Sequence, residues 1–552
     1  MNKILFAGFL LYSIGNSFEG ITQPLGKKGP FTRQDSLRGS INAERDGWDV
    51  DSYVIDITPD FTKRFISGRT EIAFKIKKSF TIMQIDLQEP MEIRNITWRK
   101  KNLPYHREGN VYHVQFPELL TVGRSESITI NFSGYPKVAV NPPWDGGWIF
   151  QKDKLGRPWM SVACQGLGAS VWFPCKDHQS DEPDHGASLN ITVPDTLMAV
   201  GNGRLKGTKS NSQGTMTYQW TVVNPINNYN LVPYIGKYVH WNEDYAGENG
   251  NLTCDYWVLD YELKRAKKQF KQVPKMLRSF EYWFGPYPFY KDGYKLVQSP
   301  HLGMEHQSAV AYGNGFQNGY LGKDLSGTGW GKKWDFIIVH ESGHEWFGNN
   351  ITTNDIADMW VHEGFTNYAE TLFTTSQFGI EAGNDYVIGT RNLIANDIPI
   401  IGPYGVNTRG SGDMYYKAGN MLHTIRSAIN DDEKFRQILR GLNKTYYHKT
   451  VEGKEIETYI SQQSGIDFSS VFDQYLHSTT IPVLEYEMEG TSIRYRFSIC
   501  NNNFTLPVKV NLGRETWLTP TTTWKNEQLD NWFDGKTFII DRNFYIQSKR
   551  TK

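Results

Sequence analysis

The stretch DFIIVHESGHEWFGNN, from Asp335 to Asn350, places two histidines four residues apart with a glutamate directly after the first. Its apolar residues recur at three- and four-residue steps, which predicts a mostly buried helix from Trp334 to Phe347. Residues four apart lie on one face of a helix, so His340 and His344 can both direct an imidazole at one metal ion. Glu341 lies beside them, where it can polarise a water on that ion. This H-E-x-x-H pattern is typical of zinc metallopeptidases, although two surface histidines beside an ordinary glutamate would give the same letters.

A zinc site needs a third protein ligand and one position that stays open to water. Glu363 follows His344 by nineteen residues, near the start of a second helical pattern, DMWVHEGFTNYAETLF. A helix, a short turn and another helix would return Glu363 to the ion. His362 is the rival ligand, but neighbouring residues on a helix point about 100° apart, so only one of the two should face the metal.

The composition excludes several classes of function. The 552 residues are too many for one hydrophobic core and favour about three or four domains. Lysine plus arginine equals aspartate plus glutamate, at 59 each, so the charge balance gives no indication of binding to nucleic acid or to an anionic membrane. A hydrophobic content of 39% with 14% aromatic residues is typical of a globular protein. A small, neutral or mixed substrate fits this balance better.

The first residues, MNKILFAGFLLYSIGNSFEG, are typical of a secretory signal peptide. Lys3 precedes an apolar run from Ile4 to Leu11, and small or polar residues follow that run. A membrane anchor is the alternative, but the run is shorter than the roughly 20 apolar residues that span a bilayer, and no stable membrane span is expected elsewhere. We therefore expect a signal peptide over residues 1–17 and export to the periplasm or the extracellular space.

Patterning along the rest of the chain predicts an α+β multidomain protein. Residues 18–45 lack periodicity and are expected to form a linker or an extended arm. Short alternating runs over residues 46–243 predict an N-terminal antiparallel β domain. Helical spacing dominates residues 244–478, which predicts a helix-rich domain, and strand patterns return over residues 479–552 as a small C-terminal β domain.

The four cysteines, Cys164, Cys175, Cys254 and Cys500, form no C-x-x-C pair. This excludes a zinc ribbon and a thioredoxin motif. An oxidising compartment would permit a disulfide between Cys164 and Cys175, and two buried free thiols are the alternative. The spacing leaves both open.

The motif of His340, Glu341 and His344, followed after eighteen residues by Glu363, resembles the gluzincin zinc aminopeptidases. This thermolysin-related family contains aminopeptidase N and leukotriene hydrolase, and this chain resembles a secreted bacterial-type member. The flanks agree, since HEWFGNNIT is similar to the family's H-[QS]-W-x-G-N-x-x-T and MWVHEGFTNYAE to its x-W-L-N-E-G-x-x-x-Y-x-E. The resemblance implies a thermolysin-like catalytic domain that holds one Zn²⁺ per chain through His340, His344 and Glu363.

A second segment, LGMEHQ from Leu302 to Gln307, resembles the family's G-x-M-E-N exopeptidase segment. By this resemblance Gly303 and Met304 contribute to substrate binding, and Glu305 binds the free α-amine of the substrate. The sequence departs from the family at His306, where the family has asparagine.

Two more segments carry residues of the implied site. DMYYKAGNML, over residues 413–422, resembles the family's Y-x-K-G-A helix, which gives Tyr415 the role of stabilising the transition state. ACQGLGASVWFPCKD, over residues 163–177, resembles the family's C-x-A stretch followed by P-C-x-D, which makes Gln165 a candidate for substrate binding.

The resemblance implies an enzyme that hydrolyses the first bond of peptides with a free N-terminus, by attack of a metal-activated water with Glu341 as the base. Two alternatives stay open. Gln165 matches the leukotriene branch, so an epoxide hydrolase-type side activity is one alternative. A non-catalytic, peptide-binding member of the same family is the other, and such a protein should have lost a metal ligand or Glu341.

Overall fold

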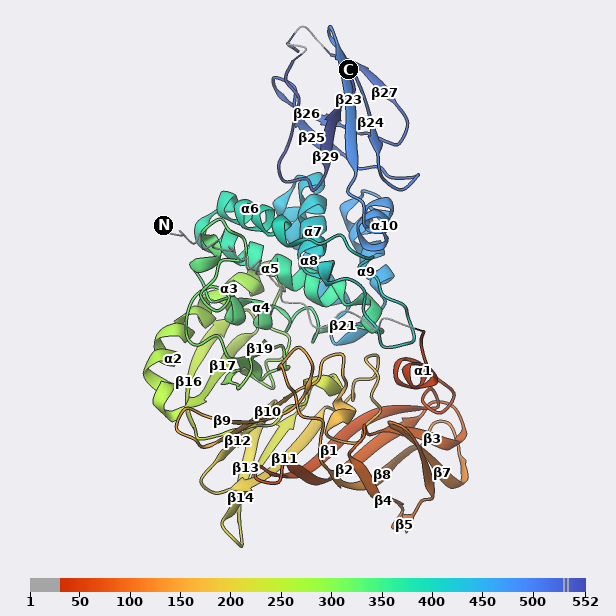
Figure 1. Cartoon of the computed structure of the whole chain (residues 1–552), viewed down its shortest axis with the longest axis vertical. Helices are drawn as coiled ribbons and strands as arrows, with labels where there is room; N and C mark the ends of the chain where they lie inside the picture. Colours follow the sequence, from red (N-terminus) through yellow and green to blue (C-terminus); the bar gives the residue numbers. More distant parts are fainter. Residues whose placement is uncertain (1–29, 530–531, 534–535) are drawn as a thin grey trace, which may run out of the picture.

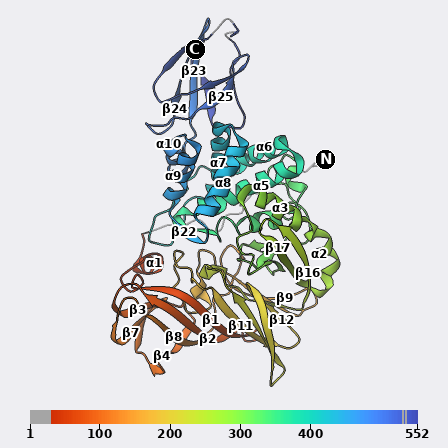
Figure 2. The same ribbon diagram turned by 180° about the vertical axis from the view of Figure 1, so that it is seen from behind.

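The computed structural model describes residues 30–529, 532–533 and 536–552. The signal peptide expected over residues 1–17 lies outside these residues. Figure 1 shows a β-rich N-terminal domain and a smaller C-terminal β domain at the two ends of the long axis, with the helices between them. The same order is seen from behind in Figure 2. This confirms the expected α+β architecture of a β domain, a helix-rich domain and a small β domain.

The N-terminal domain is built on an eight-stranded sheet, accompanied by smaller sheets of four and three strands. Inward and outward residues alternate along its first strand, as the sequence pattern predicts for a sheet with one buried face. The pairing is antiparallel apart from one parallel pair, β1 with β11. The eight strands, in order across the sheet, are β13 (Arg204–Asn211), β14 (Thr215–Val222), β11 (Ala187–Pro194), β1 (Trp48–Asp60), β2 (Phe65–Ile76), β8 (Ser125–Gly134), β4 (Glu92–Trp98) and β5 (Lys101–Asn102). The smaller sheets are β12 (Met198–Val200), β15 (Tyr234–Gly236), β10 (Pro158–Ala163) and β9 (Gly147–Lys152), and β3 (Phe80–Asp86), β7 (Val111–Leu120) and β6 (Tyr105–Glu108).

The catalytic domain joins a five-stranded sheet to a group of helices. Strand β16 belongs to this sheet, so the sheet begins at Tyr238, a few residues before the expected boundary at 243/244. The strands are β16 (Tyr238–Gly247), β17 (Gly250–Leu259), β18 (Tyr294–Gln298), β20 (Val310–Tyr312) and β19 (Gly303–Met304), and a separate pair is β21 (Ile351–Thr353) with β22 (Lys449–Val451). The helices are α2 (Leu263–Gln269), α3 (Val273–Phe284), α4 (Phe336–Gly343), α5 (Trp360–Phe378), α6 (Ile380–Gly389), α7 (Tyr416–Ile429), α8 (Asp432–Thr445), α9 (Gly453–Ser464) and α10 (Ser469–His477).

Helix α4 is the helix expected from the opening stretch, and it is shorter than expected. Asp335 caps its N-terminus by accepting hydrogen bonds from the backbone of Ile337 and Ile338. The helix ends at Gly343, and the buried Phe347 lies in the turn that follows. The apolar pattern therefore extends past the helix because the turn is also buried.

The C-terminal domain consists of two small sheets that share a hydrophobic core with the catalytic domain. One sheet contains β27 (Lys525–Gln528), β24 (Ser492–Ser498), β23 (Val483–Glu489) and β29 (Gln547–Arg550). The other contains β26 (Glu515–Leu518), β25 (Val508–Asn511) and β28 (Ile539–Ile540). A second core fills the N-terminal domain.

The segment expected to be a linker contains helix α1 (Arg33–Gly39). Thr32 and Asp35 form a capping box at its N-terminus, and Leu37 is buried. A helix of seven residues shows no clear periodicity, so its sequence resembles that of a linker.

All four cysteines are free thiols, and Cys164 and Cys175 are both buried. The structure therefore agrees with the alternative of two buried thiols rather than a disulfide. Among the described helices, none is both long enough and apolar enough to cross a membrane.

Candidate metal centre and active site

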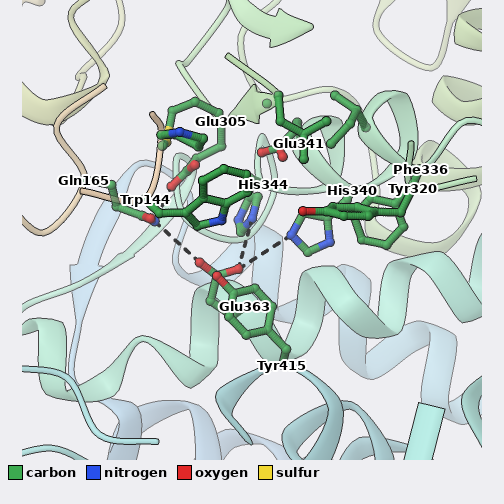
Figure 3. A pocket seen from close by; sticks show the side chains of 15 residues that line it. Trp144, Gln165, Glu305, Tyr320, Phe336, His340, Glu341, His344, Glu363 and Tyr415 are labelled. Atoms are coloured by element: carbon green, nitrogen blue, oxygen red, sulfur yellow. Dashed lines mark hydrogen bonds and ion pairs between the residues drawn. The ribbon is translucent and has the colours of Figure 1, made fainter. Parts of the chain in front are cut away.

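Helices α4 and α5 bring together the three side chains expected to hold a metal. His340 and His344 project from the end of α4, and Glu363 from the first turn of α5. The Glu363 Oε2 atom lies 3.6 Å from His340 Nε2 and 3.3 Å from His344 Nε2. Dashed lines mark both contacts in Figure 3. All three side chains are buried. The sequence spacing thus brings one ligand atom from each residue within 4.8 Å of the others.

The other nitrogen of each imidazole, Nδ1, forms a hydrogen bond with an oxygen atom. His340 Nδ1 lies 2.7 Å from Glu370 Oε1, and His344 Nδ1 lies 3.0 Å from the backbone oxygen of Phe347. A carbonyl oxygen can only accept, so His344 Nδ1 carries a proton, which leaves Nε2 as the nitrogen that can bind a metal. Metal-binding histidines typically show this arrangement.

This geometry fits a cation. When His344 Nε2 carries no proton, it and Glu363 Oε2 are two acceptor atoms that face each other and repel. Within the described part of the chain, Glu363 Oε2 is buried with no hydrogen-bond partner. A cation placed among the three ligand atoms removes both the repulsion and the unsatisfied charge. Two imidazoles and one carboxylate are a donor set that suits zinc.

His362, the rival ligand, faces away from this cluster. Its Nε2 atom accepts a hydrogen bond from the backbone N–H of Thr353 at 2.9 Å. Burial, together with the nearby His344, lowers the pKa of His362 to about 3, so the ring is neutral. Glu363 is therefore the residue of this pair that meets the two histidines.

Glu341 lies against strand β19. A Cβ atom built on Gly303 would come within 2.4 Å of Glu341 Oε1, so only glycine leaves room for this carboxylate. Burial raises the pKa of Glu341 to about 7, with His340 lowering it and Glu305 raising it. A carboxylate with a pKa near neutrality is suited to take up and release a proton.

Glu305 follows β19 and lies at the edge of the metal cluster. Its carboxylate accepts hydrogen bonds from the Gln165 amide nitrogen and, at 3.1 Å, from the Tyr229 hydroxyl. Asn349 Nδ2 donates to the Glu305 backbone oxygen at 2.8 Å, which holds this segment against the turn after α4. Burial raises the pKa of Glu305, His344 lowers it and Glu363 raises it. Met304 and Gly303 line the same pocket.

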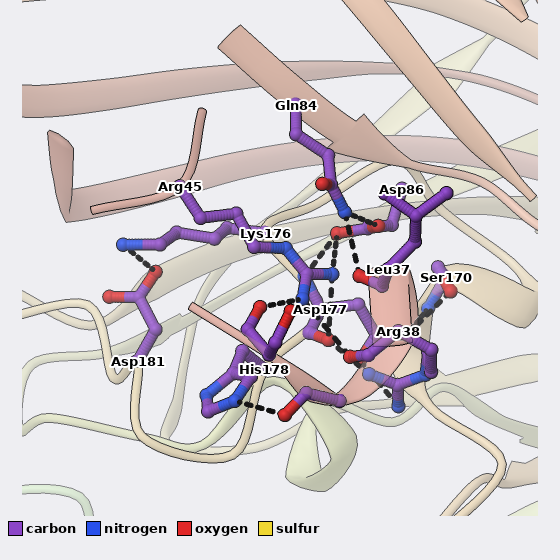
Figure 4. A network of polar contacts seen from close by, with 12 residues as sticks. Leu37, Arg38, Arg45, Gln84, Asp86, Ser170, Lys176, Asp177, His178 and Asp181 are labelled. Atoms are coloured by element: carbon purple, nitrogen blue, oxygen red, sulfur yellow. Dashed lines mark hydrogen bonds and ion pairs between the residues drawn. The ribbon is translucent and has the colours of Figure 1, made fainter. Parts of the chain in front are cut away.

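A buried polar network, shown in Figure 4, includes the loop that follows Gln165. Asp177 accepts hydrogen bonds from the backbone of Ser170 at 3.0 Å and of Ala169 at 3.3 Å, which closes the loop after Gln165. Arg38 of helix α1 pairs with the same carboxylate at 3.1 Å. The segment expected to be a linker thus stabilises the loop that carries Gln165.

Tyr415 lies between the short 3-10 helix Gly412–Met414 and α7, on the other side of the ligands from Glu341 in Figure 3. The centroids of its ring and the His340 ring are 6.0 Å apart. Burial and the nearby Glu363 carboxylate raise the pKa of Tyr415 well above its usual value. The hydroxyl therefore keeps its proton and can donate a hydrogen bond in the pocket.

These groups line one shared pocket. Its described lining includes three carboxylates, those of Glu305, Glu341 and Glu363, and no lysine or arginine. A divalent cation and one ammonium group would together balance these three negative charges. The rest of the lining, apart from Gln165, His340, His344 and Tyr415, is apolar or aromatic: Pro143, Trp144, Leu302, Gly303, Met304, Tyr320, Phe336 and Ile337.

Sequence analysis did not identify Tyr229, Asn349 or Trp144 as site residues. Tyr229 lies 76 residues before the Glu305 carboxylate that it contacts, in a polar stretch typical of a turn. Asn349 lies within the flanking motif HEWFGNNIT, and the match of that motif to the family could have identified it as a site residue. Trp144 follows two prolines in a turn, and no local pattern relates it to the pocket.

The chain matches two models of one peptidase family. Residues 50–229 match the Peptidase M1 N-terminal domain, and residues 269–475 match the Peptidase family M1 domain. Among curated relatives, a probable aminopeptidase 1 from Saccharolobus solfataricus is 19% identical over 78% of this chain and 55% of its own length. Leukotriene A-4 hydrolase from Xenopus laevis is 21% identical over 73% of this chain and 66% of its own length. The chain thus spans about half the length of the archaeal relative.

A similar fold has been solved for an M1 zinc metallopeptidase from Deinococcus radiodurans, as a mutant bound to a Tyr-Ser-Ala substrate. The two structures align with a TM-score of 0.66 at 21% identity, over 81% of this chain and 98% of the other. The alignment agrees with the architecture described above. The two family models together cover more than half of the sequence. The chain therefore belongs to the M1 peptidase family.

Proposed function

We propose that the protein is a zinc-dependent aminopeptidase that removes the N-terminal residue from peptides with a free N-terminus. The position of Glu305 carries this proposal. Ligand atoms of Glu305, Glu341 and His344 lie within 4.8 Å of one another. One residue spans at most about 3.6 Å along a chain, so an ammonium held by Glu305 leaves the first peptide carbonyl at the metal cluster.

The side chains divide the chemistry among them. When bound, a zinc ion supplies Lewis acidity that polarises the substrate carbonyl and lowers the pKa of water. Glu341 takes a proton from the attacking water and passes it to the leaving amine. The protonated Tyr415 hydroxyl donates a hydrogen bond to the carbonyl oxygen as negative charge develops there, a contact typically worth about 2.7 to 4 kcal/mol. Glu305 holds the ammonium, and Gln165 and Tyr229 hold Glu305 in place.

Metal removal tests the proposal. We expect a chelator to abolish hydrolysis of aminoacyl-naphthylamides and added zinc to restore it. Without the ion, no Lewis acid polarises the substrate carbonyl. Zinc content should be measured on the same samples. Undiminished hydrolysis by protein shown to be free of metal would contradict the proposal.

We also propose that the protein is exported to the periplasm or the extracellular space. Lys3 and the apolar run from Ile4 to Leu11 support a signal peptide over residues 1–17. Sequencing the N-terminus of the mature protein tests this. Cleavage near residue 17 is expected, and retention of Met1 on protein located in the cytosol would contradict it.

A further inference from the structure

The pocket has an apolar wall at each end. Figure 3 shows Trp144 on the side of Gln165 and Glu305, whereas Phe336 and Tyr320 lie at the opposite end, beyond His340. Under the proposed function the ammonium lies at Glu305. The first side chain of a substrate is attached one carbon away from that ammonium, so it lies near the end of the pocket that contains Trp144.

Strand pairing explains why Trp144 and Gln165 lie at the same end. In the β9–β10 hairpin, Gly147 pairs with Ala163 at the end of the ladder. Trp144 precedes Gly147 by three residues, and Gln165 follows Ala163 by two. The same ladder end therefore presents both side chains to the pocket.

The turn that carries Trp144 is held by its own hydrogen bonds. The carboxylate of Asp145 accepts from the backbone of Val140 at 2.6 Å and of Asn141 at 3.0 Å. The backbone N–H of Trp144 donates to the backbone oxygen of Asn141, also at 3.0 Å. These contacts fix the backbone beneath the indole before any ligand arrives.

Among the described residues, the Trp144 indole has no hydrogen-bond partner and no ring-stacking partner. Trp144 is half-buried and lines the pocket. Trp148, a few residues later, is fully buried and packs against Trp172 with ring centroids 6.0 Å apart, as expected for a structural tryptophan. An aromatic face held toward a pocket without a packing partner is suited to bind an apolar group.

We propose that Trp144 forms the wall of the subsite for the N-terminal side chain and selects peptides that begin with a large apolar residue. This inference rests on the proposed function. Glu305 is the carboxylate on the Trp144 side of the pocket, and in the proposed function it serves the ammonium, while Glu341 and Glu363 serve as base and metal ligand. Trp144 and the adjacent Pro143 add no charge to this wall. A lysine side chain in this subsite would lose water without gaining a partner.

Kinetics on substrates that differ only in the first side chain test the assignment. We would compare Leu-, Phe-, Ala- and Lys-naphthylamide with the wild type, Trp144→Ala and Trp144→Phe. Val140→Ala is the matched control, because Val140 lies in the same turn and is 91% exposed. The wild type should prefer leucine over lysine by at least about tenfold in kcat/KM. Trp144→Ala should lower kcat/KM for leucine and phenylalanine by about ten- to hundredfold and for alanine by no more than about threefold.

Trp144→Phe should recover most of the loss, and Val140→Ala should behave as the wild type. Equal losses on all four substrates, or an unchanged ratio between leucine and alanine, would overturn the assignment. Calorimetric titration of the zinc-loaded protein with L-leucine and L-alanine gives a second readout that does not need turnover. The ratio of the two affinities should fall by a similar factor in Trp144→Ala.

The two readouts separate the inference from the proposed function. If the wild type binds L-leucine through Trp144 but hydrolyses none of the substrates, the aminopeptidase proposal fails and the subsite assignment stands. If hydrolysis depends on zinc but neither ratio depends on Trp144, the assignment fails alone. Failure of the wild type to bind L-leucine would also overturn it.

Discussion

Removing the Glu370 carboxylate is expected to weaken zinc binding, although Glu370 would not touch the ion. Its Oε1 atom accepts from His340 Nδ1 at 2.7 Å, and its Oε2 atom accepts from the Tyr386 hydroxyl at 2.6 Å. These two bonds fix the orientation of the His340 ring and the nitrogen that faces the metal site. Loss of such a partner typically lowers metal affinity by about 10- to 100-fold. This range corresponds to about 1.4 to 2.8 kcal/mol.

Two substitutions of Glu370 are expected to lie at different ends of this 10- to 100-fold range of lost zinc affinity. In Glu370→Gln the amide nitrogen can turn toward Tyr386, whose hydroxyl oxygen can accept, while the amide oxygen still accepts from His340. Only the charge is lost, so a weakening of about tenfold is expected. In Glu370→Ala the bond to His340 is lost as well, and about 100-fold is expected.

Competition of the metal-free protein with a chromophoric zinc chelator measures the affinity. Asp358→Asn is the control, because Asp358 is a buried carboxylate of the same region that bonds to Tyr404 and to the Gly453 backbone rather than to a ligand. Its zinc affinity should match the wild type. Melting temperatures establish that each variant is folded. Wild-type affinity in both Glu370 variants, or an equal loss in Asp358→Asn, would refute the reasoning.

The other site residues give two further predictions. Glu341→Gln keeps the shape of the side chain and the three metal ligands, so zinc content should stay near one per chain while kcat falls by about 10² to 10⁴; a mild loss would assign the base to another residue. Tyr415→Phe should lower kcat far more than it raises KM, because its hydrogen bond strengthens as charge develops on the carbonyl oxygen. Steady-state kinetics measure both parameters, and a rise in KM alone would make Tyr415 a binding residue only.

The clustering of His340, His344 and Glu363 was predictable from helical spacing and motif, although the connection between the two helices was not. Helical spacing places His340 and His344 on one face. The expected short turn before Glu363 is instead a longer connection that contains β21 and a 3-10 helix over Ile356–Asp358. The end of α4 was not predictable from periodicity, because periodicity reports burial. Phe347 is buried in the turn after the helix, and it continues the apolar pattern.

Features that depend on contacts between residues far apart in the sequence were not predicted, because local patterns do not report such contacts. Helix α1 is short and polar, and nearby ion pairs such as Arg38 with Asp177 and Arg45 with Asp86 connect this part of the chain to the N-terminal domain. Tyr229 and Trp144 reach the pocket through the tertiary arrangement of the N-terminal domain. The direction of neighbouring helical side chains, by contrast, already indicated that only one of Glu363 and His362 faces the metal, and the family resemblance selected Glu363.

Matched free and N-acetylated peptides test whether Glu305 fixes cleavage at the first bond by holding a terminal ammonium. Acetylation removes the positive charge and leaves a buried carboxylate without its partner, which typically costs about 3 to 5 kcal/mol. Burial raises the pKa of Glu305, so protonation can relieve part of that cost, and we expect the lower end, a loss of about 100-fold in kcat/KM.

The measurement is a time course by mass spectrometry on both peptides with the zinc-loaded protein. We expect the free peptide to lose single residues stepwise from its N-terminus while the acetylated peptide stays intact. Glu305→Ala should reduce the difference in cleavage rate between the two peptides, mainly by slowing cleavage of the free peptide. Equal cleavage of the two peptides, or internal fragments that appear first, would contradict the role of Glu305 even if the zinc site is correct.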